Sequence, residues 1–210
     1  MTAFIHANPR LRWALATLWI LSFLVALVSV RFAFVAIETI PPFMVHHLEI
    51  RPIVFYGHVA AASVALALLA LQFSPRLRMA RPALHRWSGR LYVTSVALGG
   101  VSGVWLGATT SAGFVAGAGF VILGLLWLWT TAKAVGFARV RDFARHRAWM
   151  IRSASLTLAA VTLRIYLPLL SVTLGLEAGY VLVAWLCWVP NILLAEWILR
   201  REPRRREVSA

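Results

Sequence analysis

Six apolar segments alternate with polar connections along the chain. Each segment meets or approaches the ~20 residues that a helix needs to cross about 30 Å of hydrocarbon. The segments cover residues 13–37, 52–73, 91–109, 112–132, 149–173 and 178–199. The pattern therefore predicts an all-α bundle of six transmembrane helices in a single integral membrane domain. The first segment is too long for the apolar part of a signal peptide, so we expect it to be retained as an anchor.

Composition agrees with a membrane protein. The 210 residues are 61% hydrophobic and 13% charged, with a mean hydropathy of +0.79. A soluble domain of this length cannot bury so much apolar surface. The single cysteine, Cys187, lies within an apolar segment and excludes a disulfide framework.

The formal net charge of +14 comes mostly from twenty arginines set against seven acidic residues. Arginines are abundant in the connections 74–90 and 133–148 and in the basic tail 200–210, whereas the connections 110–111 and 174–177 carry none. The excess of positive charge in cytoplasmic loops predicts that both termini are cytoplasmic. At the ends of membrane helices these arginines meet lipid phosphates, so we expect membrane lipids and no nucleic acid as partners.

Small residues recur at every fourth position in two neighbouring segments, 91–109 and 112–132. They are Ser95, Gly99, Gly103 and Gly107 in the first of these, and Gly113 and Gly117 in the second. In lipid, this spacing allows helix backbones to approach closely. The same groove could instead admit a flat ligand.

The fifth segment carries a polar stripe. His146 and Arg164 are eighteen residues apart, which is five full helical turns, so they point the same way, and Ser153, Thr157 and Ala160 fall close to the same line. A small, polar, ionisable stripe on an apolar helix is expected to face other protein and not lipid.

Two histidines begin similar helices at the cytoplasmic edge. His85 and His146 are each followed by an arginine, and His85 shares one helical face with Ser88 and Tyr92. Both imidazoles are therefore expected to point into the bundle at the same depth. Two inward imidazoles at one level are what axial ligation of a haem iron requires. The alternative is that both histidines lie among lipid headgroups.

The arginines that come after these histidines are expected to extend to lipid phosphates. They are Arg86, Arg90, Arg147 and Arg152. Glu196, near the inner end of the last apolar segment, is expected to pair with one of them.

An outer layer of candidate residues contains His58, Arg164 and Tyr166. Helix 149–173 returns Arg164 to about the depth of His58, because eighteen residues rise ~27 Å. A charge at this depth costs roughly 2.5–3.5 kcal/mol unless it is paired or hydrated. The layer could bind an anionic or quinone-like small molecule, or Arg164 could serve as a structural clamp.

The connection between the first two segments contains His46, His47 and Glu49. Adjacent histidines followed by a carboxylate could hold a metal ion, but the helical spacing that would make them converge is absent. The alternative is a solvated loop at the membrane surface.

Two segments carry a family resemblance. HRWSGRLYV (residues 85–93) and HRAWMIRSASLTLAAVTLRIYLP (residues 146–168) resemble a family of uncharacterised bacterial multi-pass membrane proteins that is defined only as a domain of unknown function. The resemblance covers roughly residues 50–200 and implies a location in the bacterial cytoplasmic (inner) membrane. The histidine-bearing bundle is also similar in style to cytochrome b and ferric-reductase-like domains, which typically ligate haem with histidines in two layers. Here the outer layer has only His58.

These residues support three functional hypotheses. The first is a haem b-binding electron-transfer protein with His85 and His146 as axial ligands. The second is a ligand-binding or transport protein that uses His58, Arg164 and Tyr166. The third is an accessory membrane subunit whose arginines contact only lipid. The sequence has no nucleophile–base pair, P-loop or dinucleotide-binding fingerprint, so it assigns no enzyme class.

Overall fold

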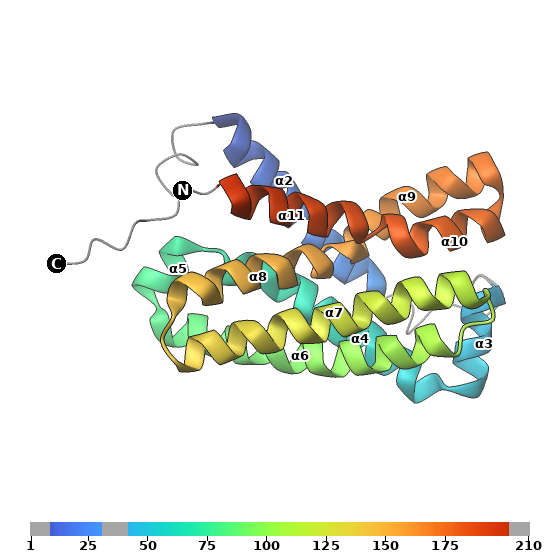
Figure 1. The fold of residues 1–210 in the computed structure, drawn as a ribbon, viewed down its shortest axis with the longest axis horizontal. Helices are drawn as coiled ribbons and strands as arrows, with labels where there is room; N and C mark the ends of the chain where they lie inside the picture. The colour runs from blue at the N-terminus through green and yellow to red at the C-terminus, as the bar shows by residue number, and fades with distance from the viewer. Residues whose placement is uncertain (1–8, 31–41, 202–210) are drawn as a thin grey trace.

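The computed structural model describes residues 9–30 and 42–201, and in these ranges the chain is helical with short turns (Figure 1). The helices are α2 (Pro9–Val30), α3 (Pro42–Ile50), α4 (Pro52–Gln72), α5 (Pro75–Ala80), α6 (Pro82–Ala108), α7 (Phe114–Arg139), α8 (Phe143–Thr157), α9 (Ala159–Leu174), α10 (Leu176–Leu186) and α11 (Val189–Arg201). The predicted all-α class is confirmed.

Five stretches of the described chain are long and apolar enough to cross a membrane. They are Pro52–Gln72, Pro82–Ala108, Phe114–Arg139, Phe143–Leu174 and Leu176–Arg201. Helix α2 contains a shorter apolar stretch, Trp19–Ser29, and residues 31–37 of the first predicted segment lie outside the described residues. The sixth span and the cytoplasmic position of both termini therefore stay predictions.

Local sequence explains where several helices begin. Proline occupies the first turn of α4, α5 and α6, where its missing N–H costs nothing. The Ser74 hydroxyl accepts a hydrogen bond from the Leu77 N–H at the start of α5, and the Asp142 carboxylate accepts one from the Arg145 N–H at the start of α8. As a result α6 and α8 begin before the apolar segments, and their first turns carry His85 and His146.

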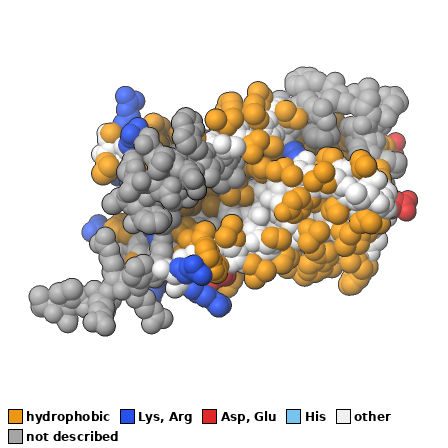
Figure 2. All heavy atoms as spheres, turned by 90° about the horizontal axis from the view of Figure 1, so that it is seen from above, with side chains coloured by type: hydrophobic (Ala, Val, Ile, Leu, Met, Phe, Trp, Pro, Cys, Tyr) orange, Lys and Arg blue, Asp and Glu red, His pale blue; other side chains and the backbone are white. Residues whose placement is uncertain are grey.

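The surface separates apolar flanks from a charged end, as is typical of a membrane protein. Figure 2 shows flanks made mostly of hydrophobic side chains, with most of the Lys and Arg side chains gathered toward one end of the molecule. Large apolar side chains such as those of Phe114 and Val172 are almost fully exposed. Exposed apolar groups of this extent are stable against lipid and not against water.

Close packing of α4, α6 and α7 depends on glycine. A Cβ placed on Gly99 would lie 3.3 Å from the Ala62 backbone nitrogen of α4, and one on Gly107 would lie 3.0 Å from the Val121 nitrogen of α7. A Cβ on Gly117 would lie 2.7 Å from the Gly107 carbonyl oxygen. The groove of small residues is thus filled by neighbouring helices, as the packing interpretation predicts.

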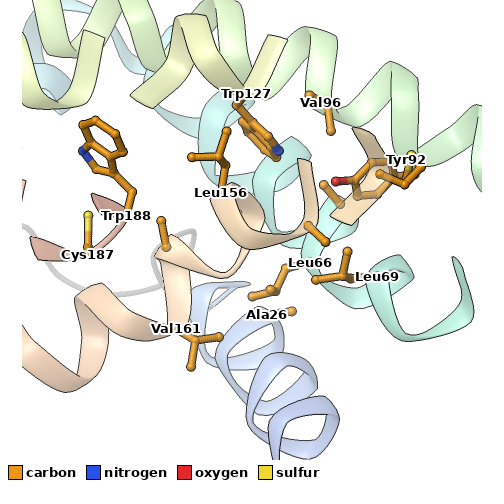
Figure 3. Packing of buried hydrophobic residues seen from close by; sticks show 14 of the residues in the cluster. Ala26, Leu66, Leu69, Tyr92, Val96, Trp127, Leu156, Val161, Cys187 and Trp188 are labelled. Carbon is orange, nitrogen blue, oxygen red and sulfur yellow. The ribbon is translucent and has the colours of Figure 1, made fainter. Parts of the chain in front are cut away.

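The buried core lies where α2, α4, α6 and α7 meet α8, α9 and α10. Figure 3 shows Leu66, Val96 and Trp127, from α4, α6 and α7, around a shared centre, and Ala26 of α2 joins the same cluster. Tyr92 and Leu69 are completely buried. This core holds the polar side chains of the candidate site.

Both C-terminal spans are interrupted. The stretch Phe143–Leu174 breaks at Leu158, between α8 and α9, and the stretch Leu176–Arg201 breaks between α10 and α11. Asn191 joins the two breaks, because its Nδ2 lies 3.2 Å from the Ser155 carbonyl oxygen, 3.0 Å from the Cys187 carbonyl oxygen and 2.9 Å from the Thr162 hydroxyl. One amide thus supplies hydrogen bonds to carbonyls of both spans.

A substitution at one of the close glycine contacts tests this packing. Gly107→Ala places a methyl group against Phe120 and Val121, so we expect it to lower the stability by about 1–3 kcal/mol. Gly136→Ala is the control, because nothing lies within 4 Å of its Cβ position. Thermal unfolding in detergent should show a lower Tm for the first variant alone. Equal Tm values would show that the α6–α7 contact tolerates a side chain.

Candidate functional site

The structure brings His85 and His146 together at one end of the bundle. His85 lies in the first turn of α6 and His146 in the first turn of α8, and the two imidazoles are close enough to interact electrostatically. Both are partly buried. Arg78 and Arg86 also lie within electrostatic range of His85, so this end of the site is positively charged.

The tautomer of His146 is determined by one hydrogen bond. Its Nδ1 lies 2.8 Å from the carbonyl oxygen of Ala134, on α7. A carbonyl oxygen only accepts, so Nδ1 carries the hydrogen and Nε2 is left with a free lone pair. Histidines that ligate metals are commonly oriented by a backbone carbonyl in this way.

His85 has a different environment. Among the residues that the structure describes, no partner lies within hydrogen-bond distance of its buried Nδ1. A buried polar atom without a partner costs about 1–3 kcal/mol, so such atoms often mark sites that bind something.

A chain of four hydroxyl groups lies about two helical turns deeper than the histidines. The Tyr92 hydroxyl of α6 is 2.7 Å from Ser153 Oγ and 2.8 Å from Thr157 Oγ1, both of α8. Thr131 of α7 is 2.7 Å from Ser153 Oγ, and Trp127 Nε1 donates to Thr157 Oγ1 at 2.9 Å. The network joins three helices that the sequence separates by up to 65 positions.

The hydroxyl chain has a backbone carbonyl at each end. Thr131 Oγ1 can donate to the Trp127 carbonyl at 2.8 Å, and Thr157 Oγ1 can donate to the Ser153 carbonyl at 2.9 Å. In one proton order Thr131, Ser153, Tyr92 and Thr157 donate in turn, and Thr157 donates to its carbonyl. In the other order every donor is reversed, and Thr131 donates to its carbonyl. Each order uses all four hydroxyl protons.

The sequence pattern predicts only part of this network. It places Tyr92 on the face of His85, and Ser153 and Thr157 on the stripe of His146. It does not single out Thr131 or Trp127. Their only sequence signal is the four-residue spacing of a threonine and a tryptophan inside an otherwise apolar helix.

The outer candidates His58 and Arg164 also come together. His58 is partly buried on α4, its Nδ1 lies 2.8 Å from the Gly99 carbonyl oxygen of α6, and Arg164 is within electrostatic range. A Cβ placed on Gly103 would lie 2.9 Å from His58 Cε1. The ring therefore fills the space that this glycine leaves open.

Arg164 connects α9 to α2. Its Nη1 donates to the Ala160 carbonyl at 2.9 Å, and its Nη2 donates to the Ser29 hydroxyl at 2.6 Å. These contacts are those of a clamp between two helices. Tyr166, the third outer candidate, packs against the buried apolar cluster.

The histidines before the second span lie on a helix. His46 and His47 belong to α3, where their ring centroids are 5.4 Å apart, and His47 is buried while Glu49 is exposed. The segment is thus not a solvated loop. Within residues 9–30 and 42–201 the structure has no cluster of three or more His, Cys, Asp or Glu residues suited to a metal ion.

The prediction that Glu196 pairs with an arginine is confirmed by geometry. Arg152 binds the Glu196 carboxylate through Nε at 2.5 Å and Nη2 at 3.0 Å, and its guanidinium carbon lies 4.7 Å from the centroid of the Trp149 ring. Arg152 is therefore bound to α11 and does not extend to lipid, in contrast to the expectation for it.

The fold and the exposed apolar bands define a polytopic helical membrane protein. Residues 55–199 match the family described as predicted membrane proteins, DUF2306, and the chain belongs to this family. Comparison with curated proteins gives no match, and comparison with solved structures gives none either.

Removal of the central hydroxyl tests the network. Tyr92→Phe leaves Ser153 and Thr157 without their shared partner in a buried place, so we expect a loss of about 1–3 kcal/mol. Tyr56→Phe, at an exposed tyrosine, is the control. The measurement is thermal unfolding in detergent. An unchanged Tm for Tyr92→Phe would mean that the hydroxyl chain adds no net stability.

Proposed function

We propose that this membrane protein binds haem b through His85 and His146 and transfers electrons. The observation that supports the proposal most directly is the pairing of the two imidazoles at one end of the bundle. One has an Nε2 lone pair, because its Nδ1 donates to Ala134, and the other has a buried Nδ1 without a partner in the described chain.

The residues around the pair fit this group. Haem propionates are anionic, and Arg78 and Arg86 provide positive charge next to His85. Helix bundles commonly hold such cofactors between side chains of facing helices. When bound, the haem supplies one-electron redox chemistry at its iron.

The protein residues have separate roles in this proposal. His146 is held in one orientation by the Ala134 carbonyl. Arg78 and Arg86 would supply the positive charge that holds the anionic propionates. The hydroxyl chain of Tyr92, Ser153, Thr131 and Thr157 links α6, α7 and α8 about two helical turns deeper than the histidines.

Absorption spectroscopy tests the haem proposal. Protein purified from haem-replete cells should show a Soret band with a low-spin spectrum, and His85→Ala or His146→Ala should each abolish that spectrum. Loss of both histidines should cost little more, because the two residues act on one bound group. His46→Ala is the control and should leave the spectrum unchanged. Colourless wild-type protein, or an unaltered spectrum in both single variants, would overturn the proposal.

A second candidate function rests on the outer pair. The Gly99 carbonyl requires the hydrogen of His58 on Nδ1, so Nε2 is an acceptor near the Arg164 guanidinium. An acceptor beside a cation suits an anionic or quinone-like small molecule. We propose this binding role for His58, Arg164 and Tyr166 if the protein proves to be a binding or transport protein.

Two substitutions of Arg164 separate binding from architecture. If Arg164 binds an anionic group, Arg164→Lys should fold but weaken the bound state, because a lysine ammonium does not reproduce the planar fork of donors. If Arg164 is a clamp, Arg164→Leu should lower the Tm, because it removes the hydrogen bond to the Ser29 hydroxyl that joins α9 to α2. The measurement is the Tm of both variants with and without an added soluble quinone. A destabilised Leu variant with an unchanged quinone shift would rule out the binding role.

A further inference from the structure

A second group of buried polar atoms without hydrogen-bond partners among the described residues lies at the end of the bundle opposite His85 and His146. It is independent of the proposed haem site. Helix α3 packs at this end, and Arg51 connects it to α4 (Figure 1). The Arg51 N–H donates to the His47 carbonyl at 2.9 Å, so the two residues are one helical turn apart. This arrangement places their side chains in the same region of the α3–α4 junction.

Two buried nitrogen atoms mark the site. His47 is only 6% exposed, and its Nδ1 has no hydrogen-bond partner in the described part of the chain. The same is true of Nη1 of Arg51, which is buried although the rest of that side chain is partly exposed. Two such atoms would each cost about 1–3 kcal/mol if nothing bound them.

The imidazole of His47 and the guanidinium of Arg51 together favour an anionic ligand. Burial lowers the pKa of His47, and the nearby His46 and Arg51 lower it further, so the imidazole is neutral at neutral pH. A neutral imidazole can donate from Nδ1, and a guanidinium only donates. A metal ion is disfavoured, because Arg51 carries a positive charge and Glu49, the nearest carboxylate in sequence, is exposed.

The surroundings indicate which anion. Arg51 directly precedes the second span, which begins at Pro52, so it lies at the level where apolar surface begins. Ile50 and Ile53, on either side of it, are 58% and 87% exposed. Beneath them Leu48, Phe55 and Leu106 form a small apolar cluster. A free phosphate ion would leave both isoleucines in water, whereas a lipid covers them with its acyl chains.

We propose that His47 and Arg51 bind the phosphate group of a phospholipid at this end of the bundle. The planar guanidinium matches two phosphate oxygens, and the His47 Nδ1–H supplies a third donor. The acyl chains extend along Ile50 and Ile53. This site lies at the end of the bundle opposite His85 and His146 and shares no residue with that pair.

Lipid retention and lipid-dependent stability test the site. Full-length wild-type protein purified in mild detergent should retain one phospholipid by native mass spectrometry. Arg51→Gln and His47→Phe should each bind added palmitoyl-oleoyl-phosphatidylglycerol about tenfold more weakly, the loss expected for one charge-assisted hydrogen bond. Tyr56→Phe, at an exposed residue of α4 that belongs to neither the site nor the arginine clusters, should bind as the wild type does. If Arg51→Gln does not fold, His47→Phe alone provides the test.

Delipidated protein separates the two sources of phosphate. Addition of phosphatidylglycerol should raise the Tm of the wild type and not that of His47→Phe. Inorganic phosphate at millimolar concentration should leave the wild-type Tm unchanged. A rise with inorganic phosphate equal to the rise with lipid would overturn the lipid assignment. Equal lipid affinity in all variants would overturn the site itself.

Discussion

Polar groups inside an apolar membrane must be satisfied by the protein itself, and the described bundle depends on this constraint. Tyr92, Ser153 and Thr157 hold α6 to α8 through hydroxyl contacts that no water is needed to complete. The Asn191 amide nitrogen donates to carbonyls at two helix breaks, and Arg152 forms an ion pair with Glu196. Because apolar side chains gain little by leaving lipid, these polar contacts and the close glycine packing determine which helices are neighbours.

The sequence predicted features that depend on local periodicity. Long apolar runs identify spans, and five of six were confirmed. The four-residue spacing from Gly99 to Gly107 predicted close packing, which the contacts with Ala62 and Val121 confirm. Packing, and not periodicity, decides which face of α7 meets α8. The hydrogen bond of Thr131 to Ser153 therefore could not be predicted from the sequence. No proline or glycine marks the helix break at Leu158. The amide that donates to the Ser155 carbonyl near this break belongs to Asn191, far along the chain.

The two ends of the bundle present different chemistry on one scaffold. At one end the first turns of α6 and α8 carry His85 and His146 beside arginines. At the other, α3 and the start of α4 bury His47 and part of Arg51. Between them, glycines bring α4 so close to α6 that the His58 ring occupies the space above Gly103. The same small residues that pack the helices therefore set the position of an ionisable side chain in the interior.

The hydroxyl chain gives the centre of this membrane domain a response to charge that apolar packing lacks. Its four O–H dipoles can reverse together while every heavy atom stays in place, because each end has a carbonyl ready to accept. In an interior of low dielectric constant, an orientable dipole stabilises whichever sign of charge lies nearby, as a few solvent molecules would. The interior of the bundle thus contains a small polarisable element about two helical turns from the histidine end.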